Sequence, residues 1–245
     1  MGKHSKKKSK KNILPNLLLV LFFILLVISF IEIIKWYKEN KRNQKIQEKI
    51  SEAVIINEEE TLIDFNKLKE INKDTVGWLK VNGTDIEYVV VKANDNSYYL
   101  DHNVENEYNK AGWIFADYKN KLDGTDKNKV VYGHNRRDGS MFASLKNILK
   151  EEWYNNEDNY TIDFVTELET QKYKVFSVYK IKNEDYYITT NFNDEEFTKF
   201  IQILKQRSIK DFNMEITAQD NILTLSTCAN NNNYRIVLHA KRIDI

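Results

Sequence analysis

The chain has 245 residues, 42% hydrophobic and 30% charged, which is the composition of an ordinary globular protein. Six lysines within residues 1–12 outweigh the net charge of +1, so the rest of the chain is mildly acidic. This distribution argues against a nucleic-acid-binding protein, because such proteins carry a basic surface for the phosphate backbone.

An apolar run follows the lysine-rich tail and predicts a membrane-spanning helix over residues 13–34. A cleaved signal peptide is the alternative, but its apolar core is usually shorter and ends in small residues. Here Trp36 and Tyr37 follow, and both suit a membrane interface. Basic residues on the two sides nearly balance, so the positive-inside rule gives only a weak preference for a cytoplasmic N-terminus. The tail fits a membrane surface better than a nucleic-acid arm.

Residues 35–60 are polar and charged and predict a helical stalk. Apolar residues spaced by three within 64–72 predict a short helix. Strand-like runs at 76–81 and 86–91 flank Asn82-Gly83, a strong turn signal, and so predict a hairpin. Further strands are predicted at residues 112–116, 129–132, 160–165, 172–181, 222–227 and 235–242.

Two helices are predicted among these strands. One covers residues 140–150, capped by Asp138 or Ser140, and the other covers 194–207, capped by Asn193. Many short strands with few helices indicate a mainly β fold, a barrel or a sandwich with helical decoration.

Cys228 is the single cysteine of the chain and stands where an apolar strand meets an asparagine-rich loop. A buried, inert thiol is one interpretation of such a residue. The strand end favours the other, a nucleophile that is held rigidly and can be reached. An internal disulfide is excluded, because one thiol has no partner.

His134 and Arg235 are the candidate partners of this thiol. His134 follows Val130-Val131-Tyr132-Gly133, a strand ending in a glycine that permits close approach. Arg235 opens the last strand, where its guanidinium could stabilise a developing oxyanion. Taken singly, each has a plainer interpretation, a structural histidine and a surface arginine. Together with Cys228 they indicate thiol acyl transfer. His4, His102 and His239 are weaker candidates, and the spacing of cysteine and histidine predicts no metal site.

Residues 224–228, Thr-Leu-Ser-Thr-Cys, with Arg235 downstream and Tyr132-Gly133-His134 upstream, resemble the sortases of Gram-positive bacteria. Four further stretches resemble class B sortases in particular: residues 71–79, 83–90, 95–100 and 139–142. The resemblance covers about residues 60–245. It implies a closed eight-stranded β-barrel with N-terminal helices, preceded by one transmembrane helix. The implied domains are a cytoplasmic tail (1–12), an anchor (13–34), a stalk (35–60) and an extracellular catalytic domain (61–245).

The resemblance also implies a reaction, transpeptidation without a cofactor. Cys228 would cleave a C-terminal sorting motif of a secreted protein, Asn/Ser-Pro-x-Thr-Gly/Asn-like, after its threonine. His134 would act as general acid and base, Arg235 would hold the oxyanion, and a peptidoglycan amine would resolve the thioester. Asn96, Leu100, Tyr132 and Ser226 match substrate-groove positions of the family.

Two departures from the family concern the loop after Cys228. The loop is short and asparagine-rich, and Ala229 stands where some relatives have an acidic residue. Two other functions stay open at this point, a cysteine peptidase that only hydrolyses and a membrane-anchored binding module without catalysis.

Overall fold

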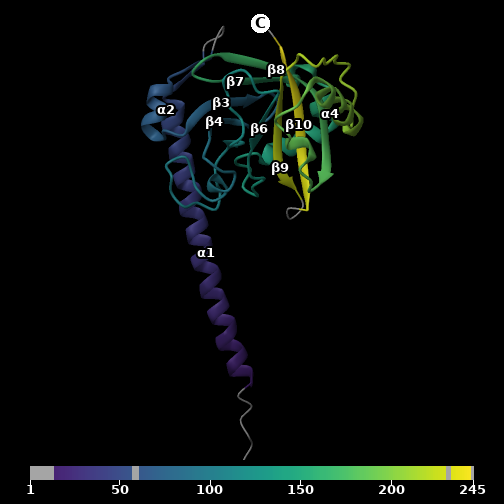
Figure 1. Cartoon of the computed structure of the whole chain (residues 1–245). Coiled ribbons are helices and arrows are strands. Elements are labelled where there is room, and N and C mark those ends of the chain that lie inside the picture. The colour runs from purple at the N-terminus through teal and green to yellow at the C-terminus, as the bar shows by residue number, and fades with distance from the viewer. Residues whose placement is uncertain (1–13, 57–60, 230–232, 244–245) are drawn as a thin grey trace, which may run out of the picture. The chain divides into compact units, whose positions relative to one another are not determined.

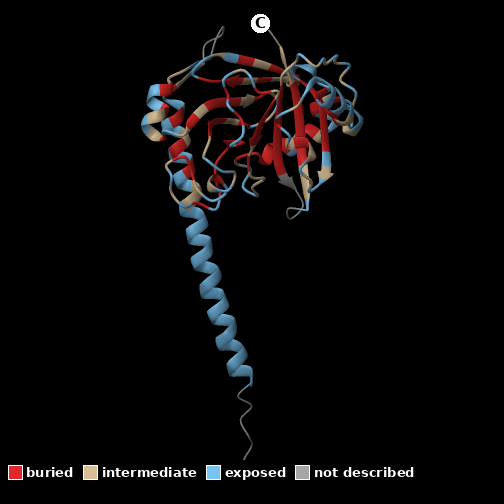
Figure 2. Cartoon of the chain, in the orientation of Figure 1, coloured by how far each residue is buried: buried red, intermediate tan, exposed pale blue. Residues whose placement is uncertain are grey.

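The computed structural model describes residues 14–56, 61–229 and 233–243, and the chain divides into two compact units between Lys45 and Ile46. The first unit holds most of helix α1 (Leu14–Ser51), whose apolar side chains from Leu14 to Ile34 are exposed (Figures 1 and 2). By length and composition, this helix could cross a membrane.

The last turns of α1 belong to the second unit. Ile46 and Ile50 are only 1% and 4% exposed and pack into its core. The helix ends at Ser51, so the prediction of helix up to residue 60 was wrong. Val54–Ile56 instead forms strand β1, which pairs antiparallel with β2 (Thr61–Ile63), because a run of β-branched residues favours a strand. Residues 57–60 of the predicted stalk lie outside the described part of the chain.

Eight strands of the second unit close into a barrel, in the order β10-β8-β7-β3-β4-β5-β6-β9. The neighbours pair antiparallel except for β4 with β5 and β6 with β9, which run parallel. The bounds are β3 Thr75–Val81, β4 Glu87–Val91, β5 Phe115–Ala116, β6 Asn128–Tyr132, β7 Thr161–Val165, β8 Thr170–Lys182, β9 Ile222–Ala229 and β10 Tyr234–Ile243. The barrel, and not the sandwich, is therefore the correct architecture.

The predicted strands are present, and the β3–β4 hairpin turns at Gly83, whose φ of 68° favours glycine. The strand predicted over 112–116 is shorter than expected. It begins only at Phe115, because Gly112 adopts a left-handed φ of 58° in the preceding turn.

Two α-helices match their predictions. Helix α2 (Phe65–Ile71) is capped by Asp64, whose side chain accepts a hydrogen bond from the backbone nitrogen of Lys67. Helix α4 (Asp194–Arg207) begins with a reciprocal capping box between Asn193 and Glu196.

The predicted helix over 140–150 is not a regular α-helix. A 3-10 helix, η2 (Ala143–Leu149), leads into a single turn, α3 (Glu151–Tyr154). The Asp138 carboxylate binds the nitrogen and hydroxyl of Ser140, and so neither residue caps η2. Three more 3-10 turns, η1 (Tyr98–Leu100), η3 (Glu157–Tyr160) and η4 (Tyr186–Ile188), lie in the connections.

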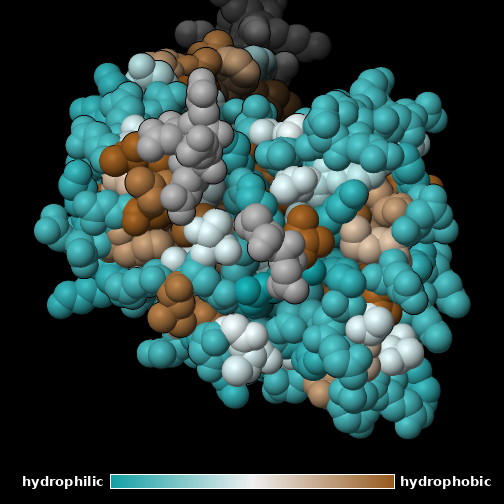
Figure 3. Space-filling view, turned by 90° about the horizontal axis from the view of Figure 1, so that it is seen from above, coloured by the Kyte–Doolittle hydropathy of each residue, from teal (hydrophilic) through white to brown (hydrophobic). Residues whose placement is uncertain are grey.

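Two apolar clusters hold the second unit together. One fills the barrel and includes Leu223 and Leu225 of β9. The other lies between the outer face of β8, β9 and β10 and helix α4, which contributes Phe197, Phe200, Ile201 and Leu204. Strands between the two clusters are buried on both faces, which explains the unbroken burial of β9 up to Thr227 (Figure 2). By contrast, the face seen in Figure 3 is mainly hydrophilic, with small separate apolar patches.

Candidate functional site

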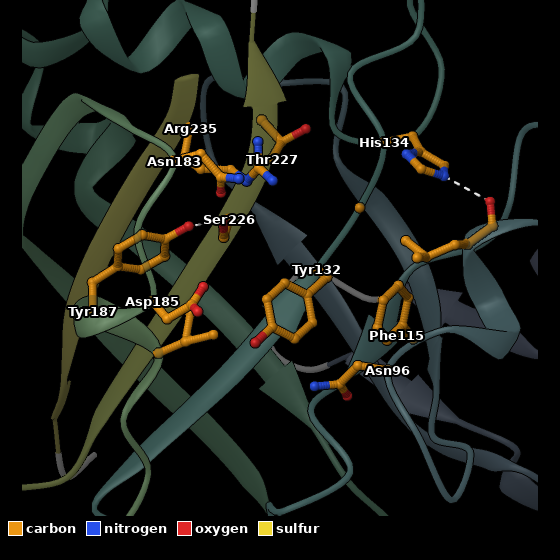
Figure 4. Close-up of a pocket in the computed structure, with 13 residues that line it drawn as sticks. Asn96, Phe115, Tyr132, His134, Asn183, Asp185, Tyr187, Ser226, Thr227 and Arg235 are labelled. Carbon is orange, nitrogen blue, oxygen red and sulfur yellow. Dashed lines mark hydrogen bonds between the residues drawn. The ribbon is translucent and has the colours of Figure 1, made fainter. Parts of the chain in front are cut away.

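An open cavity of about 240 Å³ lies at the ends of β6 and β9 and is partly enclosed by the connection after β8 (Figure 4). Its walls hold six of the seven residues predicted from the sequence. The lining residues are Asn96, Leu100, Phe115, Tyr132, Gly133, His134, Asn183, Asp185, Tyr187, Ile188, Ser226, Thr227 and Arg235.

Parallel pairing of β6 with β9 brings the two sequence motifs together. Tyr132 is the register partner of Ser226, and the Gly133 nitrogen donates to the Ser226 carbonyl at 3.3 Å. A Cβ at Gly133 would lie 2.4 Å from Ile114 Cδ1 and 2.6 Å from Phe142 Cγ, so no larger residue fits without movement. The glycine before the histidine is therefore needed for packing beneath the site.

His134 leaves the end of β6 at the rim of the cavity and is partly exposed. Its Nε2 is 2.7 Å from the carbonyl oxygen of Leu100, in the turn after η1 (Figure 4). The Leu100 side chain is 44% exposed and lines the same cavity. An apolar side chain and a histidine thus share one wall.

Cys228 and Arg235 are register partners on the antiparallel strands β9 and β10. Arg235 lines the cavity, and its Nη1 donates to the Tyr234 carbonyl at 3.2 Å. The Cys228 side chain lies outside the described residues. Its backbone position is two residues beyond Ser226 on the strand that forms the cavity wall.

The Asp117 carboxylate organises the lower wall of the cavity. Its Oδ2 accepts hydrogen bonds from Tyr132 Oη at 2.8 Å and from Asn96 Nδ2 at 2.9 Å. Burial first, and then the Asp117 charge, raise the pKa of the Tyr132 hydroxyl, so the tyrosine stays a neutral donor. Asn96 Oδ1 accepts from the Tyr118 nitrogen at 3.0 Å. Asn96 and Tyr132, two of the four predicted groove residues, are therefore held in one orientation.

The residues of the opposite wall were not predicted from the sequence. Tyr187 of η4 shares a 2.9 Å hydrogen bond with Ser226 Oγ, while Asn183, Asp185 and Ile188 line the cavity beside it. A signal was available: Tyr186-Tyr187-Ile188 is an apolar triplet in a mostly polar connection between β8 and α4. The contact between Tyr187 and Ser226 could not be predicted, because Ser226 lies far downstream in the sequence.

The two remaining described histidines lie away from the cavity. His239 is fully buried between Tyr179 Oη and Thr224 Oγ1, each at 2.8 Å. Burial lowers the pKa of its imidazole to about 3, so it is neutral. His102 stacks on Tyr98 with ring centroids 4.2 Å apart.

Over residues 14–56, 61–229 and 233–243, no three His, Cys, Asp or Glu side chains group closely enough to hold a metal ion. The expectation that no metal or cofactor takes part stays a prediction. The arrangement supplies an imidazole for proton transfer, a guanidinium for anion stabilisation and a groove of fixed polar groups beside an apolar wall.

Comparison with known proteins places these features in a family. The sortase domain model matches residues 79–243. The chain is 35% identical to sortase B of Listeria monocytogenes over 84% of this chain and 87% of the relative. It is 33% identical to sortase B of Staphylococcus aureus over 92% of this chain and 95% of that relative.

Solved structures agree with this. A crystal structure of sortase B from Bacillus anthracis in complex with AAEK1 superposes with a TM-score of 0.75 at 36% identity, over 85% of this chain and all of that one. A Staphylococcus aureus sortase B–substrate complex superposes with a TM-score of 0.69 at 36% identity, over 74% of this chain and 85% of the other.

Proposed function

Because the chain belongs to the sortase family and is a class B cysteine transpeptidase, we propose that it joins secreted proteins to a peptidoglycan amine through a Cys228 thioester. The observation that carries this proposal is the shared cavity of His134 and Arg235 beside the end of the strand that holds Cys228. The substrates are proteins with a C-terminal motif of the form Asn/Ser-Pro-x-Thr-Gly/Asn.

The reaction has two halves. The Cys228 thiolate attacks the carbonyl carbon of the motif threonine, and Arg235 donates hydrogen bonds to the resulting oxyanion. His134 protonates the leaving amine as the peptide bond breaks, which leaves a thioester. The acceptor amine then attacks the thioester, His134 takes its proton, and the Cys228 thiolate leaves.

The groove residues position the motif for this attack. Asn96 and Tyr132, both held by Asp117, offer fixed polar groups to the peptide, and Leu100 offers an exposed apolar contact. Ser226, bonded to Tyr187, joins the two walls. A solved relative is described as a sortase B–substrate complex, which supports a peptide-binding role for the equivalent groove.

We also propose the arrangement in the cell. Residues 1–12 form a cytoplasmic tail, residues 13–34 anchor the chain, residues 35–60 connect, and the catalytic domain from residue 61 faces the cell wall. The supporting observation is the long apolar stretch of α1. The core packing of Ile46 and Ile50 indicates that part of the connecting segment acts together with the catalytic domain.

The full chain in detergent tests the proposal. A library of Asn/Ser-Pro-x-Thr-Gly/Asn/Ser peptides is incubated with it and with candidate amines, and the products are identified by mass spectrometry. We expect cleavage after threonine and an amine-ligated product, and both should vanish in Cys228→Ala. Cleavage with only hydrolysed product, whatever the amine, would favour the peptidase. Absence of cleavage, with Cys228 unreactive to a thiol probe, would favour the binding module.

A further inference from the structure

The contact between His134 and Leu100 determines which ring nitrogen carries a proton. A backbone carbonyl oxygen only accepts hydrogen bonds, so at 2.7 Å the Nε2 of His134 must be the donor. In the neutral imidazole the other nitrogen, Nδ1, then bears the lone pair. The dashed line at His134 in Figure 4 marks this hydrogen bond from Nε2, while Nδ1 lies on the side of the ring towards Thr227 and Arg235.

We propose that the Leu100 carbonyl, which can approach the imidazole because residue 112 is glycine, is a positioning group that keeps His134 in the Nε2–H tautomer and presents Nδ1 to the reacting amine. This inference rests on the proposed role of His134. It identifies Nδ1 as the atom that exchanges protons. It also gives residues 100 and 112 a role in orienting His134, which the sequence analysis did not predict.

The carbonyl is well supported. The Leu100 nitrogen donates to the Ser97 carbonyl at 3.1 Å, and the Trp113 nitrogen donates to the neighbouring Tyr99 carbonyl at 2.9 Å. Tyr99 itself is buried, and its hydroxyl donates to Asp74 at 2.7 Å. The turn that offers the Leu100 oxygen is therefore fixed at both ends.

Gly112 closes this arrangement from the other side. Its φ is 58°, and a Cβ there would lie 2.5 Å from the Tyr99 oxygen, 2.8 Å from the Leu100 oxygen and 3.0 Å from His134 Cδ2. Cδ2 is bonded to Nε2, so a methyl group at 112 would press on both partners of the hydrogen bond. Glycine permits the carbonyl and the imidazole to meet.

The proton steps then take place at Nδ1. As the threonine C–N bond breaks, the proton on Nδ1 of the imidazolium moves to the leaving nitrogen, and the ring becomes neutral with its Nε2–H still bonded to Leu100. When the acceptor amine attacks, one of its protons moves to Nδ1 and the imidazolium returns. The Leu100 carbonyl accepts throughout, so the ring need not rotate between the two halves.

Nitrogen NMR of the full chain in detergent tests the tautomer directly. The ring is labelled with nitrogen-15, and long-range proton–nitrogen correlations are recorded at rising pH until the His134 signals are those of the neutral ring. The His134 signals are assigned by their loss in His134→Gln. We expect a protonated Nε2 and an unprotonated Nδ1. The opposite tautomer, or an equal mixture, would overturn the proposal even if the enzyme is fully active.

The Gly112→Ala variant tests whether glycine at position 112 is needed for the hydrogen bond between His134 and Leu100. We expect kcat for peptide cleavage to fall about 100-fold, because displacing a catalytic group by about 1 Å has an effect of that size. The His134 nitrogen signals should move towards a mixture of tautomers.

The matched control is Gly124→Ala. Gly124 also has a positive φ, of 90°, but a Cβ there meets nothing closer than the Glu169 carboxylate at 3.6 Å. The Gly124→Ala variant should therefore introduce backbone strain without a steric clash. Its kcat and its His134 signals should stay near those of the parent. Unchanged kcat and signals in Gly112→Ala, or an equal loss in Gly124→Ala, would contradict a positioning role for Gly112. If no variant and no parent turns over peptide, the proposed function fails while the tautomer measurement still stands.

Discussion

At the scale of single residues, the site depends on side chains that neighbours hold in one orientation. Asp117 holds Tyr132 and Asn96, Tyr187 holds Ser226, and the Leu100 carbonyl holds His134. Preorganised donors stabilise a transition state more than mobile ones, because they need no reorganisation when charge develops. Arg235 is the residue for which this principle gives the sharpest test.

Arg235→Lys should lower kcat/KM for peptide cleavage about 100-fold, since removing an oxyanion donor typically has that effect. Lysine keeps the charge but loses the planar fork that can bind two acceptors. Arg242→Lys, at the other end of β10, is the control. Arg242 binds Glu169 away from the cavity, so its variant should keep the parental kcat/KM. A near-parental rate in Arg235→Lys would rule out the fork as the oxyanion donor.

At the scale of elements, helix α4 supports one wall of the cavity. Its apolar face packs with Tyr187 and the outer sides of β8, β9 and β10. The capping box at Asn193 fixes where the helix begins, because the Asn193 side chain satisfies the Glu196 nitrogen at 2.9 Å. The stability of the wall therefore depends partly on a surface residue outside the cavity.

Asn193→Ala should lower the free energy of unfolding by about 1 kcal/mol, the usual effect of losing an N-cap. In a domain of this size that is a fall in Tm of roughly 2–4 °C. Thermal unfolding of the full chain in detergent measures it. Asn193→Asp keeps an acceptor at the cap and should retain the parental Tm; an equal loss in both variants would mean that the cap is not the cause.

At the scale of the whole molecule, His239 of β10 links strands of the barrel through buried hydrogen bonds. It is bonded to Tyr179 of β8 and Thr224 of β9, and Thr224 is bonded to Asn128 of β6 at 2.7 Å. Burial first, and then the charge of Arg207 on α4, lower the pKa of this imidazole and disfavour its charged form. The folded protein therefore holds this histidine neutral where an unfolded chain would protonate it.

Stability should fall as pH falls from about 7.5 towards 5, by about 2 kcal/mol from this residue alone. The pKa of this imidazole is about 3 in the folded state, below the ordinary histidine value of 6.5, so the unfolded chain takes up the proton first as the pH falls. Unfolding free energies measured across this range should show a shallower slope in His239→Gln than in the parent. An unchanged slope in His239→Gln would show that another group causes the acid sensitivity.

Local patterns predicted most of the strands and both regular helices after the stalk, because strand alternation, helix caps and turn residues act over a few positions. The prediction failed where longer contacts compete with them. The segment 140–150 became a 3-10 helix, with the Met141 nitrogen bonded to the distant Tyr88 hydroxyl. The stalk helix stopped at Ser51, before the β-branched residues that pair with β2.

The motif around Cys228, together with His134 and Arg235, indicated the family and its chemistry from the amino-acid order alone. Only the tertiary structure showed which groups contact these residues. They are β9 paired in parallel with β6, Tyr187 bonded to Ser226, and the Leu100 carbonyl bonded to His134. These partners are distant along the chain and include backbone atoms that every residue shares. Only closure of the barrel selects which of them meet, because the register between strands is a property of the complete sheet.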